Sequence, residues 1–385
     1  MKKKNICVVT GSRAEYGLIY WTLKEIEKSR RLHLDLVVTG AHLSREYGDT
    51  SKQIEFDDFK IKEKVKILNH NNKSEDIAAS IGQAVKKLSK IYQKLRPDIL
   101  LITGDRYEIF AAATAAVVMN IPIAHIHGGE ITEGSIDDAF RHAITKMSHI
   151  HFASTETYKK RILQLGEPKE NVFNFGAPGI ENIYKLNLLN KKEIESKLST
   201  KFNKKNLLVT FHPLTLENNL TKKYFSNLLA CLGKLVETNL YFTMANADTN
   251  GKVINDLIAK FCKNKNNCFS YKSLGQIKYL SLMKLVDCVI GNSSSGIIEA
   301  PSLKVPTINI GNRQTGRVKT KSIIDCSYKI SDIENAIKIC FSKSFLKKTS
   351  SYKNPYYKKN TSINIVKTLE EKLTTKILIK KFVDL

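Results

Sequence analysis

The fold is decided by residues 98–126, which read DILLITGDRYEIFAAATAAVVMNIPIAHI. Two short apolar runs, at 98–103 and 121–126, flank a longer alanine-rich segment whose length suits a helix. The runs are apolar at successive positions rather than at alternate ones, which is typical of strands covered on both faces. The stretch therefore predicts a strand–helix–strand unit of a parallel sheet.

The same alternation continues on both sides of this unit and then restarts. In the first half of the chain, strands are expected at 5–10, 34–39 and 149–153, and helices at 18–28, 75–95, 109–119 and 137–147. In the second half, strands are expected at 207–211, 240–244, 288–290 and 307–310, and a helix at 222–236. The fold class is therefore α/β, with two Rossmann-like doubly wound domains that face each other across a cleft.

The length supports this organisation, because 385 residues exceed one core at about 150 residues per domain. We place the N-terminal domain at residues 1–178 and the second at 179–345, with the boundary near a Gly-Ala-Pro-Gly turn. Residues 346–385 form a tail with an expected helix at 362–373.

The net charge of +25 invites a nucleic-acid or anionic-surface interpretation. Residues 101–150 nevertheless hold three Lys or Arg against six Asp or Glu, whereas residues 341–385 hold eleven against three. The basic excess thus lies mostly away from the chemically richest segment, and no nucleic-acid recognition motif accompanies it. We expect no nucleic-acid partner.

Nothing in the sequence predicts export or a membrane partner. The first apolar run is only of strand length, and the longest one, at 109–126, is interrupted by Asn120 and Pro122. Seven scattered cysteines without metal-ligand spacing are typical of reduced thiols. We expect a cytoplasmic protein.

The loop after the first strand reads GSRAEYG at residues 11–17 and suits an anion, with Arg13, Tyr16 and Gly17 as candidate ligand contacts. It matches neither the dinucleotide pattern nor the P-loop, which disfavours NAD and ATP. The alternative is an ordinary turn with a solvated arginine.

A second loop, GNSSSG at residues 291–296, has hydroxyls and backbone amides that could surround a diphosphate. Its candidate ligands are Ser293, Ser294 and Ser295, with Glu299 one helical turn on for ribose hydroxyls and Arg313 on a basic edge downstream. The alternative is a capped helix start.

The densest cluster follows two neighbouring strands. Asp105 and Arg106 end one strand, and His127 and Glu130 end the next. Because the carboxyl ends of parallel strands meet at one edge, these side chains should lie close together. Clustered carboxylates and imidazoles suit proton abstraction and donation.

Other groups are expected at the same cleft. Asp137 and Arg141 share a helix face at i, i+4, while His212, Asn246 and Asp248 end strands of the second domain. Asp105 and Asp137 could instead only cap helices, and His125 fits a buried structural histidine. No metal-binding spacing such as H-E-x-x-H occurs, so no metal site is expected.

These motifs, with Gly-Asn-Arg-Gln-Thr-Gly-Arg at 311–317, resemble the hydrolysing UDP-N-acetylglucosamine 2-epimerases, and within them the bacterial branch that feeds sialic and legionaminic acid synthesis. The resemblance covers residues 5–320 and extends to Asn-Pro-Tyr-Tyr at 354–357. It implies a GT-B-like fold whose C-terminal helix returns to the first domain. It also implies a reaction without cofactor: the nucleotide leaves C1 as the C2 proton is removed, and water adds to the resulting glycal to release N-acetylmannosamine.

The resemblance also implies residue roles. Arg13 and Arg106 would contact the nucleotide sugar, Ser293 and Ser294 the diphosphate, Glu299 the ribose and Arg313 the phosphates, while Asp105, Asp137 and His212 match catalytic positions. Family members often dimerise, and we expect a homodimer or homotetramer here.

One position departs from the family pattern. Many relatives read His-Ile-Glu-Gly-Gly-Glu where this chain has His-Ile-His-Gly-Gly-Glu, so His127 replaces a glutamate that acts as acid or base. The C2 proton could therefore be removed by His127, Glu130 or Asp105. The sequence also leaves open GDP-N-acetylglucosamine or a UDP-linked 2,4-diacetamido-6-deoxy sugar as substrate.

Two other functions fit the same cleft. A glycosyltransferase of this fold would need an acceptor and would leave the C2 hydrogen untouched. A sugar-nucleotide sensor would keep the ligand contacts but show no turnover.

Overall fold

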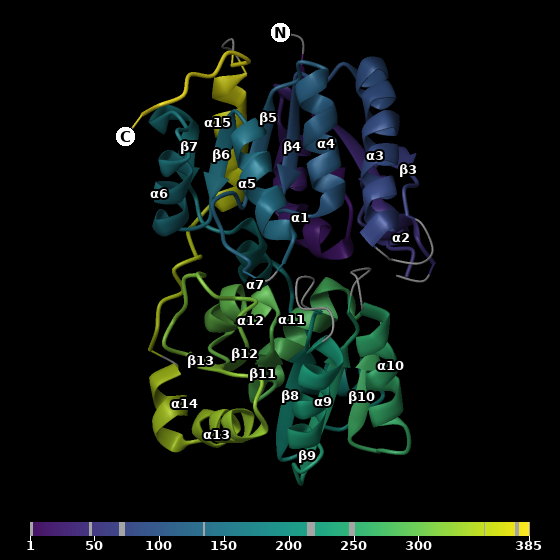
Figure 1. The fold of residues 1–385 in the computed structure, drawn as a ribbon, viewed down its shortest axis with the longest axis vertical. Helices are drawn as coiled ribbons and strands as arrows, with labels where there is room; N and C mark the ends of the chain where they lie inside the picture. The colour runs from purple at the N-terminus through teal and green to yellow at the C-terminus, as the bar shows by residue number, and fades with distance from the viewer. Residues whose placement is uncertain are drawn as a thin grey trace. The chain divides into compact units, whose positions relative to one another are not determined.

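The computed structural model describes residues 3–45, 48–68, 74–133, 135–213, 220–245, 251–349, 351–373 and 377–384. They form two compact units (Figure 1). The first consists of Met1–Glu130, Ile136–Asn182 and Tyr356–Leu385, and the second of Ile131–Ser135 and Ile183–Pro355.

The first unit is built on a seven-stranded parallel sheet in the order β3-β2-β1-β4-β5-β6-β7. Its strands are β1 Lys4–Thr10, β2 Leu32–Thr39, β3 Ile61–Val65, β4 Ile99–Thr103, β5 Ile123–Ile126, β6 Ile150–Ala153 and β7 Val172–Asn174. Its helices are α1 Arg13–Lys28, α2 Ser51–Phe56, α3 Ser74–Leu95, α4 Tyr107–Val118, α5 Asp137–Met147, α6 Glu156–Gln164 and α15 Thr361–Lys372, with α7 Glu181–Lys185 at its boundary.

Alternate residues of each strand enter separate hydrophobic cores, as a sheet covered on both faces requires. Ile6 and Val8 of β1 belong to the core shared with α1 and α15. Cys7 and Val9 belong to the core beneath α3 and α4 (Figure 1). The C-terminal helix therefore completes one face of the N-terminal sheet.

The second unit has a six-stranded parallel sheet in the order β10-β9-β8-β11-β12-β13. Its strands are β8 Lys205–Thr210, β9 Thr238–Thr243, β10 Cys268–Tyr271, β11 Cys288–Gly291, β12 Thr307–Ile310 and β13 Ile323–Cys326. Its helices are α8 Lys191–Leu198, α9 Thr221–Leu232, α10 Gly251–Cys262, α11 Gly275–Leu285, α12 Ser294–Ile298, α13 Ile330–Cys340 and α14 Lys343–Thr349. The predicted fold class, with two doubly wound parallel sheets, is confirmed.

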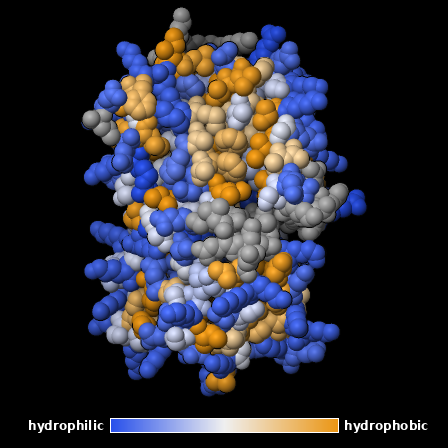
Figure 2. All heavy atoms as spheres, viewed as in Figure 1, coloured by the Kyte–Doolittle hydropathy of each residue, from blue (hydrophilic) through white to orange (hydrophobic). Residues whose placement is uncertain are grey.

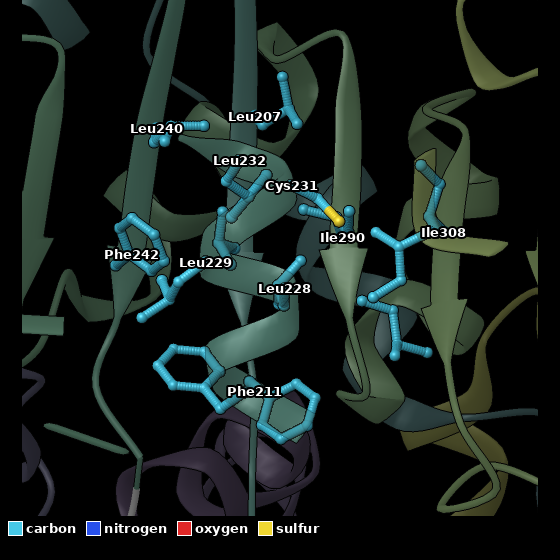
Figure 3. Close-up of a cluster of buried hydrophobic side chains, with 14 of the residues drawn as sticks. Leu207, Phe211, Leu228, Leu229, Cys231, Leu232, Leu240, Phe242, Ile290 and Ile308 are labelled. Atoms are coloured by element: carbon cyan, nitrogen blue, oxygen red, sulfur yellow. The ribbon is translucent and has the colours of Figure 1, made fainter. Parts of the chain in front are cut away.

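One large core of the second unit lies between the sheet and α9. Leu207 and Ile290 of the central strands face Leu228 and Leu232 of the helix, as Figure 3 shows. All four side chains are buried. The apolar pattern of both strands and helix is therefore satisfied by one cluster.

Both sheets reverse their order at one point. In the first unit β1 lies between β2 and β4, and in the second unit β8 lies between β9 and β11. Successive crossovers run in opposite directions from these strand pairs, which opens a crevice at their carboxyl ends. The GSRAEYG loop and the GNSSSG loop follow these strands.

Helix boundaries differ from the prediction at two loops, for local reasons. Helix α1 begins at Arg13 rather than at 18, because the Ser12 hydroxyl caps it by accepting from the backbone N–H of Glu15. Helix α9 ends at Leu232 rather than at 236, and Gly233 follows it. The early start of α1 brings the whole predicted anion loop to a helix terminus.

Hydrophilic side chains spread widely over the visible face (Figure 2). Apolar ones gather over α4 and α5, where Val118 is exposed and the Phe110 ring stacks on Phe140 at 4.8 Å between centroids. Among the described residues, no helix combines the length and apolar character that crossing a bilayer requires.

Substitution of Gly291 tests the close packing of β11 against β8 in the second sheet. A Cβ there would overlap the Thr210 carbonyl oxygen of the paired strand, and its φ of +140° disfavours any side chain. We expect Gly291→Ala to lower the free energy of unfolding by about 3 kcal/mol in urea denaturation.

Gly82→Ala is the matched control. Gly82 lies within α3, and a Cβ there meets nothing within 4 Å. Alanine should stabilise this helix by about 1 kcal/mol. Equal effects of the two substitutions would contradict the proposed packing of β8 against β11.

Candidate active site

A buried ionic network joins the ends of β4 and β5 in the first unit. The Arg141 guanidinium, on α5, binds the Asp105 carboxylate and donates to the backbone carbonyl of His127 at 3.0 Å. It also lies 3.8 Å from the Glu130 carboxylate. Arg141 therefore joins Asp105, His127 and Glu130, whose positions after neighbouring strands predicted that they lie close together.

Glu130 accepts two short hydrogen bonds within this network. The Nδ1 of His127 and the hydroxyl of Ser154 each lie 2.7 Å from the same carboxylate oxygen, Oε1. His127 itself has a left-handed backbone, with φ +69°, which costs energy in a residue other than glycine. Its Nε2 is buried and has no hydrogen-bond partner among the residues that the structure describes.

His125 takes the structural place that was expected of it. Its Nε2 lies 2.8 Å from the Gly104 carbonyl and its Nδ1 3.3 Å from the Thr145 hydroxyl. Burial lowers the pKa of His125 to about 3, so the ring is neutral at physiological pH. It supports the Gly104 turn that precedes Asp105.

A second charged group lies at the switch point between β1 and β4. The Arg106 Nε donates to Glu108 at 3.2 Å and lies 3.9 Å from Glu15. Glu15 accepts from the backbone N–H of Gly11 at 2.7 Å. Burial, and then the charge of Glu108, raise the pKa of Glu15 to about 8.

The other candidate site residues of the first unit lie at helix starts or in the core. Arg13 is the half-buried first residue of α1, and Asp137 the first residue of α5. The Tyr16 ring is buried in the core, where its hydroxyl donates to Asp57 at 2.6 Å. The carbonyl of Gly17 accepts from the Asn182 side chain. A substrate contact by Tyr16 or Gly17 stays a prediction.

In the second unit, Asn292 joins the ends of β8 and β11. Its side-chain oxygen accepts from the backbone N–H of His212 at 2.6 Å, and its amide donates to the His212 carbonyl at 2.8 Å. The Asn292 carbonyl in turn accepts from Arg313 at 3.1 Å and from Gln314 at 2.8 Å. His212 and Arg313 therefore lie on the same loop cluster.

Hydroxyl groups line the GNSSSG loop. The Ser293 side chain caps α12, and its oxygen lies 3.1 Å from that of Ser295. The Tyr279 hydroxyl lies 2.5 Å from Ser295. Glu299 follows α12 and is half-buried. The chain of hydroxyls suits phosphate oxygens, which accept hydrogen bonds.

Two candidates, Asn246 and Asp248, lie outside the described residues. Within the described ranges, no group of three His, Cys, Asp or Glu side chains is arranged to hold a metal ion. Sequence reasoning missed the roles of Glu15, Glu108, Ser154, Tyr279 and Asn292. Of these, Glu108 had a signal, since it stands two residues after Arg106 in a chain segment otherwise apolar.

The family model described as UDP-N-acetylglucosamine 2-epimerase matches residues 24–370. The chain belongs to this family. It is therefore an enzyme, a hydrolysing 2-epimerase of nucleotide sugars, and the resemblance inferred from the motifs is confirmed.

Individual relatives agree with this assignment. The chain is 44% identical, over all of both sequences, to the GDP/UDP-N,N′-diacetylbacillosamine 2-epimerase (hydrolyzing) of Campylobacter jejuni. It is 40% identical to the polysialic acid biosynthesis protein P7 of Escherichia coli, over 97% of this chain and 95% of that protein.

A solved structure shows the same fold. It is the UDP-GlcNAc 2-epimerase from Neisseria meningitidis bound to UDP-GlcNAc, with a TM-score of 0.81 and 22% identity over 95% of this chain and all of that one.

The raised pKa of Glu15 predicts a pH-dependent stability. Between about pH 5 and 8 the unfolded chain has released the Glu15 proton while the folded protein retains it, so this group makes stability fall as pH rises, by about 1.4 kcal/mol per pH unit. We expect Glu15→Gln to remove this slope in urea unfolding followed by circular dichroism.

Glu25→Gln, on the same helix, is the control. Glu25 forms an exposed pair with Lys28 at 2.8 Å, so its loss should leave the slope as in the wild type. A wild-type slope in the Glu15 variant as well would show that Glu15 is ionised in the folded protein.

Proposed function

We propose that this enzyme hydrolyses and epimerises nucleotide-linked N,N′-diacetylbacillosamine, releasing the nucleoside diphosphate and the free C2 epimer. The observation that carries the proposal is the 44% identity, over the whole of both chains, to an enzyme named for that substrate. The name of that enzyme covers both GDP and UDP, so either base is compatible with the proposal.

UDP-N-acetylglucosamine is the second candidate, and it was the first expectation from the motifs. It is favoured by the description of the family and by the ligand of the Neisseria meningitidis structure. The 40% identity to a polysialic acid biosynthesis protein supports a role in nonulosonic acid synthesis for either substrate.

The chemistry sets two requirements for the site. Loss of the nucleotide from C1 with the C2 proton gives a C1=C2 double bond, and hydration then places hydroxyl on C1 and a proton on the opposite face of C2. Inversion therefore needs proton transfer on both faces of C2. The leaving diphosphate also needs positive charge or hydrogen-bond donors.

His127 is our candidate for one of the proton-transfer groups. Ser154 donates to Glu130 and Arg141 lies near it, and both favour the ionised carboxylate. An ionised Glu130 accepts a hydrogen bond from the Nδ1–H of His127, which leaves the lone pair of the neutral ring on Nε2, where it can act as the base. A buried nitrogen without a partner gains a hydrogen bond when a substrate supplies one.

The remaining roles follow the motifs. Asp105, Asp137 and His212 are proposed for the other proton transfers, and Glu130 as the group that orients His127. Arg13, Arg106, Arg313, Ser293, Ser294, Ser295 and Glu299 are proposed to bind the nucleotide. A homodimer or homotetramer also stays a prediction, which sedimentation velocity tests.

A substrate panel in heavy water tests the function. With UDP- or GDP-linked N,N′-diacetylbacillosamine we expect release of the nucleoside diphosphate and a free sugar carrying deuterium at C2. Faster turnover of UDP-N-acetylglucosamine would select the second candidate. A product glycoside that retains its C2 hydrogen would contradict both and indicate glycosyl transfer, and binding without turnover would indicate a sensor.

Substitution of His127 tests the proposed base. His127→Gln should lower kcat by about 100-fold or more, measured as nucleotide release and C2 deuterium exchange, because the amide cannot accept a proton. His127→Glu, the residue that many relatives carry, should recover part of the loss. If the Gln variant exchanges the C2 hydrogen as fast as the wild type, His127 is not the base, and Asp105 becomes the candidate.

A further inference from the structure

Two carboxyl groups and one guanidinium meet at the switch point of the first sheet, outside the His127 network. Glu15 comes from α1, after β1, and Glu108 from α4, after β4. The Glu108 side chain is fully buried and that of Glu15 is 7% exposed, whereas that of Arg106 between them is 14% exposed. Arg106 therefore has the most exposed side chain of the three.

Glu108 is held in a slot that two glycines form. A Cβ at Gly11 would lie 3.1 Å from the Glu108 Cβ, and a Cβ at Gly40 would lie 2.7 Å from its Oε1. Gly11 follows β1, and Gly40 follows β2 with φ +55°. The side chain of Glu108 thus fits between the ends of two strands only because both positions lack a side chain.

The bonds to Arg106 use one edge of the guanidinium. Its Nε donates to Glu108 Oε2 at 3.2 Å and its Nη2 to Oε1 at 3.4 Å. Two parallel bonds from a fork to a carboxylate fix the plane of the guanidinium as well as its position. Because Glu108 is itself immobilised, Arg106 is held relative to the strands.

The charges around the pair agree with this assignment. Glu108, Arg106 and Asp105 are the charged groups that act on Glu15, and Asp105 is bound by Arg141. Glu15 stays largely protonated at neutral pH, since its pKa is raised to about 8 by burial and by Glu108. Arg106 donates two hydrogen bonds to Glu108 and lies 3.9 Å from Glu15, so Glu108 is its nearer carboxyl partner. An ion pair on an exposed surface contributes little to stability, whereas the Glu108–Arg106 pair is buried in a slot that holds the carboxylate in place.

We propose that Glu108 is a positioning residue for nucleotide-sugar binding, and that it acts by holding the Arg106 guanidinium in the orientation that receives the anionic substrate. The inference rests on the proposed function, in which Arg106 contacts the nucleotide. Glu108 itself need not touch the substrate. Its action goes through Arg106, so the effects of the two residues must be coupled.

Steady-state kinetics of the full chain test this coupling. Glu108→Gln keeps the shape and removes the charge, and should raise KM about tenfold with kcat within about twofold. In an Arg106→Ala background the same substitution should change KM no further. Independent, multiplicative effects of the two substitutions would overturn the proposal.

Glu63→Gln is the matched control. Glu63 pairs with Lys94 at 2.6 Å in the same unit, and its loss should leave KM unchanged. If Glu108→Gln does not fold, as judged by circular dichroism, Glu108→Asp replaces it, because the shorter carboxylate cannot make both bonds without moving Arg106. A wild-type KM in the folded Asp variant would overturn the proposal.

Binding of UDP and GDP, measured by calorimetry, separates this inference from the proposed function. Turnover by the wild type with an unchanged KM in the Glu108 variants would leave the function standing and reject the inference. If the wild type shows no turnover but the Glu108 variants bind the nucleotide about tenfold more weakly, the inference stands and the proposed function is rejected.

Discussion

The charged cluster after β4 and β5 of the first unit is held together by the buried guanidinium of Arg141. It binds Asp105 after β4 and the backbone of His127 after β5, and lies near Glu130. A buried cation must be paired, and here the carboxylates of Asp105 and Glu130 and the backbone carbonyl of His127 surround it. One side chain on α5 therefore holds together groups that two different strands deliver.

The two units use the same topology for different chemistry. In the first, charged and titratable side chains meet where β1 and β4 end. In the second, a neutral amide, Asn292, bridges the backbone of β11 to that of β8, with hydroxyls of Ser293 and Ser295 beside it. One unit thus gathers carboxylates, imidazole and guanidinium at its strand ends, and the other an amide and hydroxyls.

Local pattern was sufficient for the strands that carry this chemistry. Continuous apolar runs marked β4, β5, β8 and β11, because central strands of a parallel sheet are buried on both faces. Peripheral strands such as β3, whose residues alternate between half-buried and exposed positions, had no such signal and were not predicted. Proximity of Asp105, His127 and Glu130 also followed, since strand ends converge.

By itself, the sequence determined the α/β class, the order of the loops and the family, because these depend on periodicity and on short motifs. Only the tertiary structure showed that Glu130 holds His127 through Nδ1, that Ser154, just after β6, joins them, and that Glu108 occupies a slot between Gly11 and Gly40. Those contacts either join residues that are distant in the chain or depend on the direction in which one side chain points. Such contacts form only in the folded protein, because close packing of the interior excludes the other side-chain conformations.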